Sequence, residues 1–108
     1  MSTDAMLSQR IKRYRKIRNI TQEELAEEIG VTTNHIASIE AGRRQISLGT
    51  LVRVCECFHV SMAEMLPVNA ADDSALRADW IAEIDDTLAL LDTAQLGLVW
   101  KMVCGLRG

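Results

Sequence analysis

The sequence predicts an all-α fold, for three reasons. Its 108 residues include one proline, its aromatic residues amount to 4%, and no segment shows sustained alternation of apolar and polar residues. Signals for helix starts and stops instead recur at short, regular intervals. Hydrophobic residues make up 48% and charged residues 25%, which is typical of a folded globular chain and excludes the disordered and collagen-like classes.

The first helix is expected over residues 6–18. Apolar residues lie at helical spacing on one face, and a basic run occupies much of the remaining surface. This run is either a solvated helix face or a surface for an anionic partner. The apolar residues are Leu7, Ile11, Tyr14 and Ile17, and the basic ones are Arg10, Lys12, Arg13, Arg15, Lys16 and Arg18.

Two short helices are expected next, over residues 21–30 and 32–41. Thr21 and Glu24 match the Thr-x-x-Glu pattern of a capping box, in which each side chain binds a backbone N–H of the first turn. Gly30 suits the end of this helix because the residue after a helix usually has a positive φ. Thr32 is expected to cap the following helix, which ends before Gly42. The pair is expected to bury Leu25, Ala26, Ile29, Ile36 and Ile39.

Two further helices are expected to complete a domain of five. Ser47 caps the first, and Ser61 with Glu64 forms a capping box that opens a short helix ending at Pro67. The apolar face of the helix after Ser47 is expected to contain Leu48, Leu51, Val52, Cys55 and Phe58.

The chain is expected to divide into a domain at residues 1–66, a linker at 67–74 rich in Asn, Ala and Asp, and an extension at 75–108. The extension contains two amphipathic helices, the second of them capped by Asp92 or Thr93. Acidic residues are expected to line the outside of the chain after Pro67, namely Asp72, Asp73, Asp79, Glu83, Asp85, Asp86 and Asp92.

Residues 21–42 form the most informative pattern in the chain. A capped helix, a tight turn at Gly30 and a second capped helix are the spacing of a helix-turn-helix. The small side chain of Ala26 lets the two helices approach closely. The outer face of the second helix then presents short side chains, namely Thr33, Asn34, Ala37, Ser38 and Ala41.

Residues 7–66 resemble the Cro/repressor-type helix-turn-helix of the Xre family of bacterial and phage regulators. The resemblance rests on motifs in register: Arg10-Ile11-Lys12, Arg15, Thr21-Gln22-Glu23-Glu24-Leu25-Ala26, Ile29-Gly30-Val31, Ile36, Ile39-Glu40, Gly42, Leu48 to Leu51 and Val60-Ser61. It implies a five-helix, lambda-repressor-like DNA-binding domain, here with a C-terminal extension of about two helices. It also implies a sequence-specific transcriptional regulator, with a repressor that occupies a palindromic operator as the leading hypothesis.

The resemblance further implies roles for individual residues. Arg15 and Glu40 are expected to form a partly buried ion pair between the first and third helices. Base edges in the major groove of double-stranded DNA are expected to be read by Thr33, Asn34 and Ser38, with His35 and Ala37 beside them. The DNA backbone is expected to be contacted by Gln22, Thr32, Arg43, Arg44 and Arg10.

The chemistry of these side chains agrees with the roles that the resemblance implies. Asparagine is suited to bidentate contact with adenine, so Asn34 is the leading base reader, and Thr33 and Ala37 suit a thymine methyl group. No Arg or Lys lies between Thr32 and Gly42. We therefore expect little reliance on arginine–guanine contacts and A/T-rich positions in each half-site.

The extension is expected to supply a homodimer contact, because domains of this kind bind two-fold operators as dimers. Its two helices carry more apolar surface than a five-helix domain needs for its own core. They are expected to dock on the domain and on a second copy of the chain. The dimer residues expected are Trp80, Ile84, Leu88, Leu91, Leu96, Trp100 and Val103.

Other classes of function are less well supported. The sequence has no plausible catalytic set and no phosphate-binding glycine loop, so neither an enzyme nor a cofactor is expected. Cys55, Cys57 and Cys104 lack the spacing of a metal site and are expected to be small apolar residues in a reducing compartment. Without a signal peptide or a long apolar run, the chain is expected to be cytoplasmic and to have no membrane partner.

Two alternative functions stay open. In the first, the chain is an antitoxin that binds a toxin and its own promoter, and its acidic extension would suit a basic toxin, although it would equally suit a solvated helix face. In the second, the module has lost DNA binding and only pairs with another regulator.

The charge distribution qualifies the net charge of −3 and the isoelectric point of about 5.3, which taken alone argue weakly against a nucleic-acid partner. Residues 1–66 hold nine Lys/Arg and eight Asp/Glu, whereas residues 67–108 hold three and seven. We therefore expect a small positive surface on the domain and an acidic extension.

Overall fold

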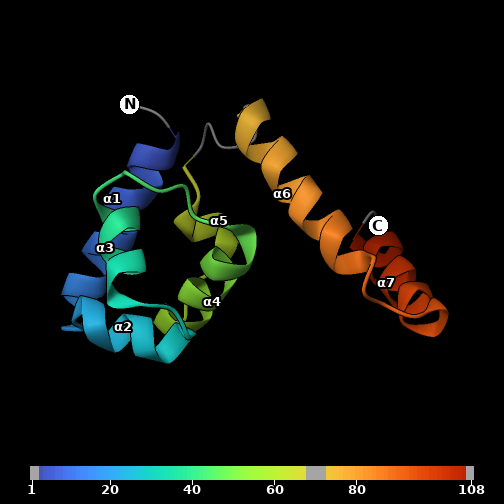
Figure 1. The fold of residues 1–108 in the computed structure, drawn as a ribbon, viewed down its shortest axis with the longest axis horizontal. Helices are drawn as coiled ribbons and strands as arrows, with labels where there is room; N and C mark the ends of the chain where they lie inside the picture. Colours follow the sequence, from blue (N-terminus) through green and yellow to red (C-terminus); the bar gives the residue numbers. More distant parts are fainter. Residues whose placement is uncertain (1–2, 68–72, 107–108) are drawn as a thin grey trace.

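Seven α-helices and no strand make up residues 3–67 and 73–106, which are the residues that the computed structural model describes (Figure 1). The prediction of an all-α fold is therefore confirmed. Five helices form the N-terminal domain: α1 (Thr3–Ile17), α2 (Gln22–Ile29), α3 (Thr33–Glu40), α4 (Leu48–Phe58) and α5 (Met62–Met65). Two further helices follow, α6 (Ser74–Leu88) and α7 (Thr93–Leu106). In Figure 1, α6 runs beside the domain near α4 and α5. Helix α7 lies next to the C-terminal end of α6, away from the domain.

The expected caps set the ends of the helices. Thr21 Oγ1 accepts from Glu24 N at 3.0 Å and Thr21 N donates to Glu24 Oε1 at 3.2 Å, which completes the capping box before α2. Gly30 ends that helix with φ +75°. Thr32 and Ser47 cap α3 and α4.

The cap of α7 is Asp92 rather than Thr93. Asp92 Oδ1 accepts from Gln95 N at 2.8 Å, while Asp92 N donates to Gln95 Oε1 at 3.0 Å. At α5, Ser61 Oγ accepts from Glu64 N at 3.0 Å, which is one of the two bonds of the expected capping box. Most of the expected linker at 67–74, including Asp72, lies outside the described residues, and Ser74 already belongs to α6.

The core lies between the five helices of the domain. The residues that α2 and α3 were expected to bury are buried, and they meet side chains from α1, α4 and α5. The largest fully buried side chains are Phe58, Leu7, Ile11, Leu25, Ile36, Ile39, Leu51, Met65 and Val54.

Two apolar residues were placed wrongly by the sequence pattern. Val52 is 36% exposed, because the buried stripe of α4 runs through Leu51, Val54 and Phe58, and each residue turns the helix by about 100°. Ile17, the last residue of α1, is 67% exposed.

Candidate nucleic-acid interface

Helix α3 has one buried face and one accessible face. Ile36 and Ile39 point into the core, and the N-terminus of the helix is closed by Thr32 Oγ1, which accepts from His35 N at 3.1 Å. The five residues expected to read bases lie away from the core stripe. Thr33 and Asn34 are exposed, and His35, Ala37 and Ser38 are partly exposed.

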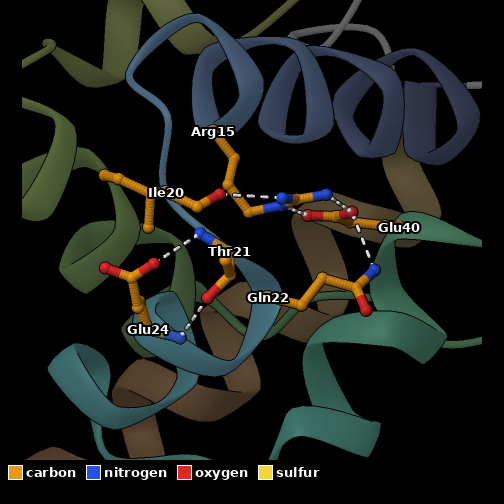
Figure 2. A network of polar contacts seen from close by, with 6 residues as sticks. All are labelled: Arg15, Ile20, Thr21, Gln22, Glu24 and Glu40. Atoms are coloured by element: carbon orange, nitrogen blue, oxygen red, sulfur yellow. Dashed lines mark hydrogen bonds and ion pairs between the residues drawn. The ribbon is translucent and has the colours of Figure 1, made fainter.

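An ion pair between α1 and α3 fixes the orientation of α3 relative to α1 (Figure 2). Arg15 Nε donates to Glu40 Oε2 at 2.7 Å and Arg15 Nη2 donates to Glu40 Oε1 at 2.9 Å. The two side chains are 10% and 2% exposed, respectively. The hydrogen bond to Glu40 raises the pKa of Arg15 above its ordinary value, against the opposite effect of burial. Arg15 Nη1 also donates to Ile20 O at 2.8 Å, which anchors the turn before α2.

Gln22, at the first turn of α2, joins the same network. Its Nε2 donates to Glu40 Oε1 at 3.1 Å, so one carboxylate binds side chains from both α1 and α2 (Figure 2). Gln22 is only partly exposed and its amide has a defined direction. The helix-turn-helix is therefore held by polar contacts as well as by its core.

The loop after α3 carries two exposed arginines and folds back over the end of the helix. Gly42 has φ +75°, a conformation that favours glycine, and Gly42 N donates to Ile39 O at 3.0 Å. Arg43 N and Arg44 N both donate to Ser38 O, at 2.9 and 3.3 Å. The backbone of both arginines is thus tied to one of the expected base-reading residues.

His35 has basic neighbours. Its pKa is lowered from its ordinary value, first by burial and then by the nearby charges of Arg44 and Arg53. Arg53 Nη1 in turn donates to Ile29 O at 3.0 Å, at the C-terminal end of α2. The positive charges of Arg44 and Arg53 therefore lie near the N-terminal half of α3.

Arg10 lies in a different environment from the other expected DNA contacts. Its Nη1 donates to the carbonyl oxygens of Glu64, Met65 and Leu66, at 3.3, 3.3 and 2.9 Å. A guanidinium group at these carbonyls stabilises the C-terminus of α5 and connects it to α1. This bonding gives Arg10 a structural role at the end of α5 instead of the expected contact with the DNA backbone.

The extension contacts the domain through α6. Leu76 is buried, and Trp80 packs against the core while its Nε1 donates to Ile46 O at 3.3 Å. Sequence reasoning placed Glu83 on a solvated acidic face, yet its carboxylate binds backbone amides of α4. The spacing between Trp80 and Glu83 could have predicted this contact. Glu83 lies about one turn after Trp80, so both side chains are on the face of α6 that docks on the domain.

Helix α7 differs from α6 because none of its described residues is buried. The expected docking of this helix on the domain is therefore wrong for a single copy of the chain. Leu91 lies beyond the end of α6, and Leu88 is partly exposed. Large apolar side chains are exposed along α7 and at two positions of α6, beside its docking residues Leu76 and Trp80: Ile81, Ile84, Leu96, Leu98, Trp100, Met102, Val103 and Leu106.

Neither a metal site nor a membrane span is found within the described residues. No cluster of His, Cys, Asp and Glu side chains in this part of the chain has a geometry that would hold a metal ion. No helix there is both long and apolar enough to cross a bilayer.

Comparison with known proteins relates the domain to regulators. Residues 11–65 match the model of a helix-turn-helix family. The chain is 34% identical over 89 residues to the transcriptional regulator SinR of Bacillus licheniformis, covering 78% of each chain. It is 32% identical over 66 residues to the control protein C.SmaI of Serratia marcescens, covering 61% of this chain and 79% of that protein.

A solved structure extends the similarity beyond the domain. The crystal structure of the clp gene regulator ClgR from Corynebacterium glutamicum matches with a TM-score of 0.60 and 29% identity. The match covers 83% of this chain and 92% of that one. The domain, residues 1–66, is less than two thirds of the 108-residue chain. A match over 83% of the chain must therefore include part of the extension.

Proposed function

Because this chain belongs to the helix-turn-helix family of transcriptional regulators, we propose that it is a repressor that binds a palindromic operator as a homodimer. The observation that carries this proposal is the accessible face of α3, whose short polar side chains lie beside a loop with two exposed arginines. An α-helix fits the major groove of B-DNA, and short side chains let its backbone approach the bases. The relatives named above are regulators rather than enzymes or antitoxins.

In this proposal, Asn34 is the principal base reader. It is exposed in the first turn of α3, and its amide matches the donor and acceptor of adenine in the major groove. Thr33 and Ser38 extend the reading surface, and Ala37 and His35 flank it. Because α3 offers no arginine or lysine, we expect half-sites rich in A·T pairs.

Phosphate contacts on either side of α3 set its position on the duplex. Gln22 and Thr32 lie at the N-terminal ends of α2 and α3, where backbone amides and the helix dipole favour an anion. Arg43 and Arg44 are exposed in the loop at the other end of α3. Such contacts orient the protein and supply affinity without reading sequence.

Selection of bound DNA from a random pool tests this function directly. We expect a two-fold symmetric site with A·T-rich half-sites, and an Asn34→Ala variant should bind it roughly tenfold to a hundredfold more weakly, since a bidentate base contact is worth ~1–3 kcal/mol. Gln9→Ala is the matched control, because Gln9 is an exposed amide on α1. Half-sites dominated by invariant G·C pairs, or equal losses in both variants, would refute the assignment of α3.

Repression requires only that the protein occupies the operator. With the selected site placed across a promoter, the chain should lower transcription of a reporter gene in proportion to occupancy. Higher transcription with the protein present would identify an activator instead.

The homodimer is proposed to form through α7 and the exposed apolar residues of α6, Ile81 and Ile84. Ile84 and Trp100 are 44% and 64% exposed, and an apolar groove of about 390 Å³ runs between α4 and α6. Several exposed apolar side chains on neighbouring helices are typical of a protein interface. A second copy supplies the same apolar helices, so the surface is self-complementary, as a two-fold dimer needs.

Sedimentation of the full chain tests the interface. Trp100→Glu should shift the equilibrium toward monomer and leave thermal unfolding of the domain unchanged, since Trp100 makes no part of the domain core. Lys101→Glu places the same acidic group on the neighbouring residue and should retain the dimer. A dimer that survives Trp100→Glu together with Ile84→Glu would refute this interface.

A further inference from the structure

The carboxylate of Glu83 closes the N-terminus of α4 from outside the domain. Glu83 Oε2 accepts from Leu48 N at 2.7 Å, and Glu83 Oε1 accepts from Gly49 N at 2.9 Å. The next amide, Thr50 N, donates to Ser47 Oγ at 3.1 Å. The first amides of a helix have no partner within it, and its N-terminus is the positive end of the helix dipole. The first two amides of α4 therefore obtain their acceptor from α6.

Gly49 provides the space that this contact needs. A Cβ atom at position 49 would lie 3.2 Å from Glu83 Oε1, closer than ordinary van der Waals contact. A methyl group there would force the carboxylate to shift by a few tenths of an ångström away from the amide. The close approach of α6 to α4 thus depends on a carboxylate at position 83 and on a glycine at position 49.

Two further bonds join α6 to the same segment. Gln45 Nε2 donates to Asp79 Oδ2 at 3.1 Å, and Trp80 Nε1 donates to Ile46 O at 3.3 Å. Residues 45–49 are thus held at three places by side chains from little more than one turn of α6. This segment begins directly after Arg44.

We infer that α6 clamps the loop after α3 and that Glu83 is a positioning residue for DNA binding. The inference rests on the proposed function, in which Arg43 and Arg44 contact phosphates. With the clamp in place, the loop is ordered before DNA arrives, so binding costs less conformational entropy. Helix α6 also carries Ile84 of the proposed dimer interface, so dimerisation and DNA affinity are coupled through one helix.

The test is the affinity of full-length variants for the DNA site selected with the wild-type chain. Charge alone predicts that Glu83→Gln binds DNA more tightly, because it removes a negative charge near phosphates. The clamp predicts the opposite, a loss of roughly tenfold. Asp86→Asn is the control, since Asp86 is an exposed carboxylate on the same helix, and it should bind as tightly as wild type or more so. Gly49→Ala crowds the carboxylate without changing charge and should weaken binding in the same direction as Glu83→Gln, but by less.

The salt dependence separates positioning from a loss of folded protein. The slope of log K against log salt should fall by about 0.9 for each phosphate contact that Glu83→Gln loses. Amide hydrogen exchange without DNA should become faster at Arg43, Arg44 and Leu48, whereas exchange in the core of α1 should stay unchanged.

Two results have different meanings. A wild-type chain that binds no DNA from the pool refutes the proposed function. A wild-type chain that binds, with a Glu83→Gln variant that matches its affinity, salt slope and exchange, refutes only the clamp.

Discussion

Removal of the Glu40 carboxylate is the most informative perturbation of this fold. Glu40 is 2% exposed and accepts three hydrogen bonds, two from Arg15 and one from Gln22. In Glu40→Ala the guanidinium group of Arg15 stays in a site where it is 10% exposed and keeps only its bond to Ile20 O among these contacts. A buried charge left without its partner costs about 3–5 kcal/mol.

That loss is large for a domain of this size. Folded domains are stable by roughly 5–15 kcal/mol, and 1 kcal/mol shifts the melting temperature of a small domain by about 4–8 °C. We therefore expect Glu40→Ala to lower the melting temperature by at least about 12 °C. Urea unfolding followed by circular dichroism gives the free energy, and an unchanged m-value confirms that the denatured state is the same.

A double-mutant cycle isolates the pair from other effects of the substitution. Arg15→Leu with Glu40→Leu removes both charges, so the double variant should be less destabilised than the sum of the single variants. Glu27→Ala, at an exposed carboxylate on α2, should change stability by less than about 0.5 kcal/mol. A loss below about 1 kcal/mol in Glu40→Ala, or additive effects of the two leucine substitutions, would refute the reasoning.

Three further perturbations follow from the structure. Thr21→Ala removes the cap of α2 and should cost about 1 kcal/mol in thermal unfolding, whereas no change would mean that water replaces the hydroxyl group. Leu51→Ala, at a fully buried position, should cost about 2–5 kcal/mol in urea unfolding, and a smaller loss would show that the core closes the cavity. The lowered pKa of His35 means that its protonation opposes folding, so stability should fall as the pH drops below about 6.5. His35→Gln should make unfolding free energies less dependent on pH between about 7 and 5, and an identical pH profile would contradict the assignment.

Local rules were sufficient for the caps of α2 to α5 and for most of the core, but they placed the start of α1 at residue 6 where the helix begins at Thr3. The capping box at Thr21 depends on a side chain three residues away, and the turn at Gly30 depends on a φ that one residue type favours. The same local reasoning failed at Val52, because the direction of the buried stripe in α4 depends on which helices surround it. When the apolar face of a helix is wider than the part that is buried, the sequence alone does not show which apolar residues face solvent.

The sequence by itself determined the fold class, the helix-turn-helix and the accessible face of α3, because helical periodicity, caps and side-chain size are local properties. Only the tertiary structure decided the roles of residues whose partners are distant in the chain. Arg10 looked like part of a basic run and binds the end of α5, 54–56 residues away. Glu83 looked like one of many surface carboxylates and caps α4, 34 and 35 residues away. A charged side chain takes its role from the group that it meets in space, and that group is set by the packing of helices rather than by its neighbours in the sequence.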